Sequence, residues 1–226
     1  MQSFNMTSHI SGKFNEELEQ LKNSVLAMGG QVELQLNRTL AAMKSNDRRS
    51  AEQVVLDDAE VNAMELRIDD ECMRIIARRQ PAAGDLRLVL TIVKINVDIE
   101  RIGDEVERIA RVVADSDMPF SERIRADMFD IGHLVLAMLQ NSLNAFARMD
   151  DVAAEQTHAE DQKVDEQYKQ LLIEVIQEMQ KKDEIDPAWL EILWALRSME
   201  RIGDRCKNIC EYVIYFVRGV NLRHED

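Results

Sequence analysis

The segment Glu100–Asp104 reads Glu-Arg-Ile-Gly-Asp and recurs without change at Glu200–Asp204. Apolar residues around both copies share the same offset of 100 residues, so the likeness extends beyond the five repeated letters. Each copy puts a glycine inside an apolar helical pattern, at a cost of about 1 kcal/mol relative to alanine. We therefore expect two similar halves, in which this glycine admits the close approach of another helix or of an ion.

Apolar residues recur at helical spacing through six segments of the chain. Few glycines (8) and prolines (3) interrupt the pattern, as is typical of a helical protein. In the third and sixth segments the apolar stripe alternates steps of four and three residues, as in helical bundles. The sequence thus predicts an all-α fold of six long helices with internal duplication. The two tandem three-helix bundles would span residues 1–118 and 119–226.

Several local signals mark the ends of these helices. The second helix should end near Pro81, because the residue before a proline resists α geometry. Asp47 and Ser50 both have the spacing to cap its beginning. A break that contains Pro119 would separate the halves, and Asp186 would cap the sixth helix. The first two helices of each half align at an offset of 103 residues, which gives a second duplicated glycine, Gly29 and Gly132.

The net charge of −14 argues against nucleic acid or an anionic bilayer as the main partner. It suits divalent cations, or a protein partner with a basic face. Three cysteines give no disulfide framework, which favours a reducing compartment. The N-terminal segment lacks the apolar run of a signal peptide, and no apolar stretch reaches the roughly 20 residues of a membrane span. We expect a cytoplasmic protein without direct membrane insertion.

The carboxylates of the repeated motif are four residues apart and therefore lie on one face of their helix. The second helix of each half offers a similar pair. If the second and third helices of a half are antiparallel neighbours, up to four oxygen ligands would meet there. Such a cluster would have raised carboxylate pKa values and would be relieved by a multivalent cation. The predicted metal ligands are Asp58, Asn62, Glu100 and Asp104 in the first half, and Asp161, Asp165, Glu200 and Asp204 in the second.

Other readings of the sequence remain open. The acid pairs could form only a solvated face of a metal-free helical scaffold. Glu155 and His158 have the Glu-x-x-His spacing of di-iron bundles, which would make the protein a di-metal carboxylate enzyme. His158, however, lies in a polar segment, which favours a surface histidine. Cys206 and Cys210 stand one turn apart on the apolar stripe and are expected to be core residues.

The two halves, each ending in a helix with Glu-Arg-Ile-Gly-Asp, resemble the PhoU family of phosphate-specific transport system regulatory proteins. Residues 200–219 are especially similar, including Lys207-Asn208-Ile209-Cys210-Glu211. Asp85-Leu86-Arg87 at the start of the third helix also fits this family. The resemblance covers nearly the whole chain, residues 14–219.

This resemblance implies two tandem three-helix bundles whose Glu/Asp-x-x-x-Asp motifs hold metal ions. The ions would be divalent or trivalent Fe, Mn, Mg or Zn. Asn62 departs from the motif, which implies fewer or weaker ions in the first half. Many relatives carry histidine where Glu105 and Arg205 stand here.

The resemblance also implies a function. The protein would be a dimeric, non-enzymatic negative regulator of the phosphate-starvation response. Its partners would be the ATPase subunit of the phosphate ABC transporter and a sensor histidine kinase.

Overall fold

The computed structural model describes residues 12–115, 122–181 and 187–219. These residues form six helices and no strand, which confirms the predicted fold class. The helices are α1 (Gly12–Ser45), α2 (Arg48–Arg79), α3 (Ala83–Asp115), α4 (Glu122–Arg148), α5 (Asp151–Gln180) and α6 (Ala188–Arg218).

The ends of the helices follow local chemistry. Asp47 caps α2, because its Oδ1 accepts a hydrogen bond from the backbone N–H of Ser50 at 3.1 Å. Gly219 ends α6 with a φ of 74°, a left-handed conformation that glycine adopts without strain. The predicted break at Pro119, the boundary between residues 118 and 119, and the predicted cap at Asp186 fall outside the described residues.

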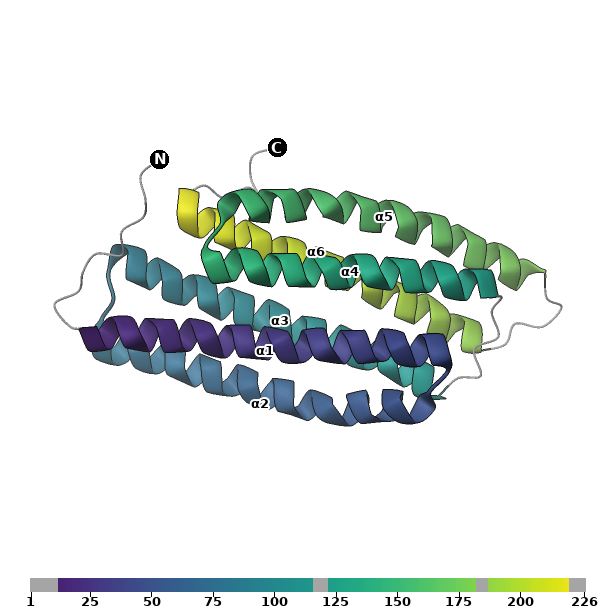
Figure 1. The fold of residues 1–226 in the computed structure, drawn as a ribbon, viewed down its shortest axis with the longest axis horizontal. Helices are drawn as coiled ribbons and strands as arrows, with labels where there is room; N and C mark the ends of the chain where they lie inside the picture. Colours follow the sequence, from purple (N-terminus) through teal and green to yellow (C-terminus); the bar gives the residue numbers. More distant parts are fainter. Residues whose placement is uncertain (1–11, 116–121, 182–186, 220–226) are drawn as a thin grey trace.

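The two halves lie side by side and share one core. Helices α1 and α4 form one face, α3 and α6 lie behind them, and α2 and α5 occupy the two outer edges (Figure 1). Contacts between the halves run mainly from α3 to α6, from α1 to α4 and within a single hydrophobic cluster. The apolar stripes of α3 and α6 therefore pack against each other as well as against the helices of their own halves.

The duplicated glycines of α1 and α4 admit side chains from the opposite half. A Cβ at Gly29 would stand 2.6 Å from Cδ2 of Leu143, and a Cβ at Gly132 would overlap Leu40. Leu40 and Leu143 are themselves related by the offset of 103 residues, as the two glycines are. The contact between α1 and α4 is thus made twice, around an approximate two-fold axis that relates the halves.

All three cysteines are buried free thiols, as the sequence predicted for Cys206 and Cys210. Both lie on the buried face of α6, together with Ile202, Ile209 and Val213. Both side chains are fully buried, so they act as small core residues.

Candidate carboxylate site between paired helices

The glycine of the repeated motif receives a carboxylate from the neighbouring helix. A Cβ at Gly103 on α3 would lie 3.2 Å from Val61 Cγ1 and 3.4 Å from Asp58 Oδ1, both on α2. At Gly203 on α6 the corresponding atoms are Val164 Cγ1 and Asp161 Oδ1, each at 3.3 Å. The second and third helices of each half are therefore close neighbours, as the sequence analysis required.

In the first half the predicted ligands influence one another electrostatically. Burial raises the pKa values of Asp58, Glu100 and Asp104 above their ordinary range. The charge of Asp104 raises the pKa values of Asp58 and Glu100 further. Asn62 donates a hydrogen bond to Asp58 Oδ2 at 3.1 Å, while the buried Oδ1 has no hydrogen-bond partner among the described residues.

Two further acids of this cluster were missed by the sequence analysis. The Glu65 charge raises the pKa of Glu100, and the Glu107 charge raises the pKa values of Asp58 and Asp104. Each stands seven residues after a predicted ligand, Glu65 after Asp58 and Glu107 after Glu100. Extending the search by two helical turns along the same face would have found both residues.

The second half differs because it carries its own cations. Lys207 donates to Asp161 Oδ2 at 2.9 Å, and Arg197 donates to Glu200 Oε1 at 2.5 Å. Lys207 occupies the position of Glu107 in the first half, so one site has an ammonium where the other has a carboxylate. Burial still raises the pKa of Glu200, and its Oε2 is buried without a partner in the described structure.

The chemistry of these donors fits a hard cation, since they are carboxylate and amide oxygens. The orphaned oxygens of Asp58 and Glu200 fit it as well. As the side chains lie, however, no three His, Cys, Asp or Glu residues in the described ranges stand close enough together to hold a metal ion. Metal binding by the eight predicted ligands therefore stays a prediction.

A polar network joins the two halves between α3 and α6. Glu105 is 8% exposed and accepts hydrogen bonds from Ser198 Oγ at 2.7 Å and from Arg201 at 3.1 Å. Asp98 is 3% exposed and accepts from Arg205 at 3.2 Å. The contacts Glu105–Ser198 and Arg205–Asp98 occupy equivalent positions under the offset of 100 residues.

Arg201 belongs to the repeated motif of the second half. Its described ion pair is with Glu105 in the other half. Glu105 and Arg205 thus join the halves through carboxylate–guanidinium pairs.

Glu155 and His158, which have di-iron spacing, contact side chains of α6. His158 Nε2 lies 3.4 Å from Glu211 Oε1 on α6, and Glu155 accepts a hydrogen bond from Arg218 at 2.9 Å. Glu155 and His158 therefore have different partners on α6 and do not converge on one site in the described structure.

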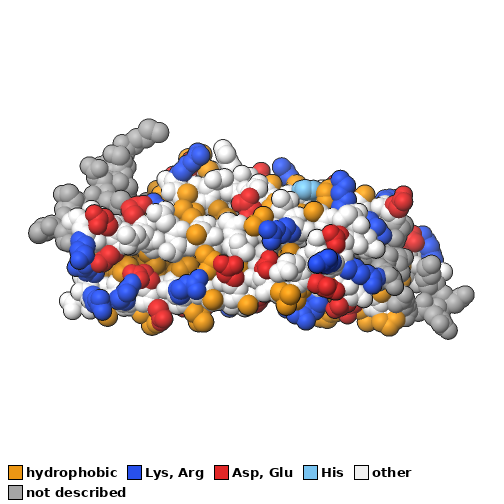
Figure 2. Space-filling view, turned by 60° about the horizontal axis from the view of Figure 1, so that its bottom comes forward, with side chains coloured by type: hydrophobic (Ala, Val, Ile, Leu, Met, Phe, Trp, Pro, Cys, Tyr) orange, Lys and Arg blue, Asp and Glu red, His pale blue; other side chains and the backbone are white. Residues whose placement is uncertain are grey.

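The outer edges of the two halves carry equivalent grooves of different character. A groove of about 390 Å³ between α1 and α2 has an apolar floor that includes Met64 and Ile68, and Arg67 and Arg74 line it. Figure 2 shows hydrophobic side chains reaching the surface among charges of both signs.

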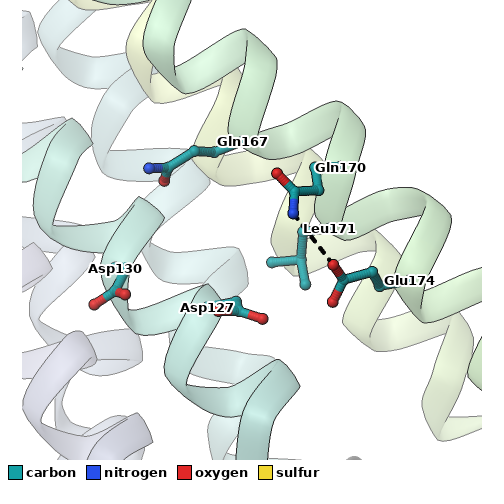
Figure 3. A pocket seen from close by; sticks show the side chains of 6 residues that line it. All are labelled: Asp127, Asp130, Gln167, Gln170, Leu171 and Glu174. Atoms are coloured by element: carbon teal, nitrogen blue, oxygen red, sulfur yellow. Dashed lines mark hydrogen bonds between the residues drawn. The ribbon is translucent and has the colours of Figure 1, made fainter.

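The hollow between α4 and α5 is smaller, about 130 Å³, and carries three carboxylates (Figure 3). Each residue that lines it is the counterpart, at an offset of 103, of a residue in the first groove. These residues are Asp127, Asp130, Gln167, Gln170, Leu171 and Glu174.

Comparison with known proteins agrees with the duplicated architecture. The PhoU domain model matches residues 25–113 and 129–213, one copy in each half. The chain belongs to the PhoU family. The phosphate-specific transport system accessory protein PhoU of Escherichia coli K12 is 42% identical over 99% of this chain and 93% of its own length. A homologue from Pseudomonas aeruginosa is 46% identical over 97% of this chain and 91% of that protein.

Solved structures of the PhoU family share the fold. The crystal structure of PhoU from Pseudomonas aeruginosa superposes with a TM-score of 0.87 at 45% identity, covering 92% of this chain and all of the other. PhoU from Streptococcus pneumoniae gives 0.85 at 30% identity, over 92% of this chain and 99% of its own. None of the described helices combines the length and the apolar character that a membrane span needs.

Proposed function

We propose that this protein is an accessory regulator of a phosphate transport system. In this role it links the ATPase subunit of the phosphate ABC transporter to a sensor histidine kinase in the cytoplasm, and represses the phosphate-starvation response. The observation that carries the proposal is the match of both halves to the PhoU domain, together with relatives named as phosphate transport accessory proteins. A homodimer is part of the same proposal.

We further propose that the acid pairs bind metal ions, and that the first half binds more tightly than the second. In the first half Asp58, Glu100 and Asp104 repel one another across α2 and α3, with Asn62 as a neutral donor. A divalent cation would relieve this repulsion and hold the two helices at a fixed spacing. In the second half Lys207 and Arg197 already neutralise part of the charge. This order reverses the expectation drawn from Asn62.

Two measurements test the proposal. Metal content after mild purification should fall in a Glu100→Gln, Asp104→Asn variant, and fall less in the matched Glu200→Gln, Asp204→Asn variant. Equal metal content in both variants and in the wild type would show that the acid pairs do not bind metal.

Co-purification with the transporter ATPase and with the kinase tests the regulatory role. We expect both partners to be retained by the wild-type protein. Retention of neither would contradict that role.

The alternative enzymatic function, a di-metal carboxylate bundle, has less support. It needs ligands that converge from four helices around an open coordination position. The predicted ligands here divide instead between two separate helix pairs, α2 with α3 and α5 with α6. A metal-free scaffold would leave the buried oxygens Asp58 Oδ1 and Glu200 Oε2 without a partner in the described structure.

A further inference from the structure

A stripe of basic residues follows the outer side of α3, in a protein whose net charge is −14. Its members are seven residues apart, so they lie almost in line along the helix. The spacing between successive members is about 10 Å, and the stripe extends for about 32 Å. It consists of Arg87, Lys94, Arg101 and Arg108.

Helix α6 continues this basic surface across the junction between the halves. Arg108 of α3 and Arg201 of α6 both donate to Glu105, so the two guanidinium groups flank one carboxylate. Arg205 of α6 pairs with Asp98 of α3, one helical repeat further along the junction. Lys94, Arg101, Arg108 and Arg201 are exposed, whereas the two carboxylates are almost wholly buried. The surface, which we call the basic seam, therefore presents mainly positive charge to solvent.

Aromatic and apolar side chains lie at both ends of the basic seam. Lys94 stands over the rings of Tyr212 and Tyr215, with its Nζ 5.3 and 5.8 Å from their centroids. Beside them, a hollow of about 370 Å³ is lined by residues that include Leu90 and Tyr215. At the other end of α6, Trp194 is 57% exposed and Leu190 is 51% exposed. These apolar ends could anchor a ligand that the basic middle attracts.

We propose that the basic seam is the docking surface for an acidic, amphipathic helical segment of a protein partner. Charge complementarity requires a negatively charged ligand, and the linear arrangement of the basic side chains requires an elongated one. One helix has a diameter of about 10 Å, which matches the spacing of two packed helices such as α3 and α6. About 21 residues of helix would span the seam and reach the apolar residues at its ends.

A flat anionic bilayer fits this surface less well than a single helix does. The acid pairs Glu100/Asp104 and Glu200/Asp204 lie on the flanks of the seam, toward α2 and α5. A plane laid on the seam would approach those carboxylates, whereas a rod between α3 and α6 would meet mainly the basic side chains of the seam. The net charge of −14 would also oppose approach to an anionic membrane.

A binding assay with a model ligand tests the seam directly. The probe is a fluorescently labelled synthetic helix of about 21 residues, with Glu at seven-residue intervals on one face and Leu at both ends. The test variant is Lys94→Glu, Arg101→Glu, which changes two exposed side chains. The control is Arg49→Glu, Lys163→Glu, which makes the same change in net charge at exposed positions elsewhere.

We expect the test variant to bind the probe at least about tenfold more weakly than the wild type, and the control to bind with nearly wild-type affinity. Vesicles of phosphatidylcholine and phosphatidylserine in equal parts should bind none of the three proteins. Equal affinity of the test variant and the control, or binding to vesicles without binding to the probe, would overturn the proposal.

The inference rests on the proposed regulatory function only in supposing that the partner belongs to the phosphate transport system. The two can be tested apart. If the wild type retains the ATPase or the kinase and the test variant loses it, the seam is the docking surface for that partner. If wild type and test variant retain it equally, the seam proposal fails and the regulatory function stands. If the wild type retains neither partner, the proposed regulatory function is contradicted. Binding of the synthetic helix then still tests the seam proposal.

Discussion

Leu143 of α4 lies directly over Gly29 of α1, with its Cδ2 2.6 Å from the position that a Cβ on this glycine would take. The next residue, Gly30, has no side-chain or distant backbone atom within 4 Å of the equivalent position. Two adjacent glycines of one helix therefore have different roles. Gly29 allows the halves to approach each other, whereas a Cβ at Gly30 would meet open space.

Alanine substitution should separate these two roles. We expect Gly29→Ala to lower the free energy of unfolding by about 0–2 kcal/mol, because moving Leu143 costs about 1–3 kcal/mol and alanine's helix propensity offsets about 1 kcal/mol. We expect Gly30→Ala to raise it by about 0.5–1 kcal/mol, because alanine favours the helix and fills open space. Urea denaturation of both variants beside the wild type measures the difference. Equal effects of the same sign would show that the contact between α1 and α4 does not depend on Gly29.

The buried pair of Asp98 and Arg205 gives a pH-dependent prediction. Removing the guanidinium in Arg205→Ala leaves a carboxylate that is only 3% exposed, and the expected loss of stability near pH 7 is about 3–5 kcal/mol. Burial is the largest cause of the raised pKa of Asp98, and loss of Arg205 raises this pKa further. A folded-state pKa above the unfolded value stabilises the fold at low pH and loses that effect as pH rises. The variant should therefore regain stability relative to the wild type as pH falls from 7 toward about 5.

Urea denaturation at the two pH values measures this effect. Arg38→Ala is the control, because Arg38 forms an exposed pair with Asp57 and its loss should cost about 0–1 kcal/mol at either pH. A loss for Arg205→Ala that is the same at both pH values would contradict the account of Asp98.

Periodicity along a single helix predicted a large part of this structure. The apolar stripe of α3, with its alternating steps of four and three residues, predicted Ile95, Ile99 and Ile102 as core residues, and all three are fully buried. The repeated glycines marked where helices approach closely, and the spacing of Glu100 and Asp104 placed both carboxylates on one face. These features depend on residues within a few turns of one another, which is the range over which a helical pattern carries information.

Contacts between the halves could not be predicted in this way. Arg205 and Asp98 are 107 positions apart, and no periodic pattern says which helix of one half meets which helix of the other. Arg201 illustrates the difficulty, because its partner Glu105 lies 96 positions away in the other half. In the candidate site, the role of Lys207 was not predicted for the same reason. Its side chain meets Asp161 across two helices, so the neutralised charge of the second half appears only once α5 and α6 are placed together.

The cysteines should be unreactive while the protein is folded. Burial raises the pKa values of Cys72 and Cys210 to about 12 and raises that of Cys206 well above its ordinary value. The thiolate is the reactive form, so a disulfide reagent near pH 8 should modify none of the three thiols in the native protein and all three after denaturation. The variant Asn23→Cys, at an exposed position, provides a thiol that should react at once. Rapid modification of one native thiol would show that its part of the core opens easily.

One pair of equivalent positions carries opposite charges in the two carboxylate sites. Glu107 adds negative charge beside Asp58 and Asp104, whereas Lys207 donates to Asp161 and lowers the pKa of Asp204. If charge governs metal affinity, reversing this one side chain should make the second half resemble the first. The affinity of oxygen sites for divalent cations rises with the number of ligand charges.

We therefore expect Lys207→Glu to bind Mn²⁺ in its second half at least about tenfold more tightly than the wild type does. Without metal the variant should be less stable than the wild type, because Asp161 loses its cation and faces a new carboxylate. Calorimetric titration, in a background of Glu100→Gln, Asp104→Asn that silences the first half, measures the affinity. Thermal denaturation with and without Mn²⁺ measures the coupled stability. Lys163→Glu, an exposed substitution of the same charge, should leave both unchanged. If Lys207→Glu and Lys163→Glu bind Mn²⁺ equally, Lys207 does not set the metal affinity of the second half.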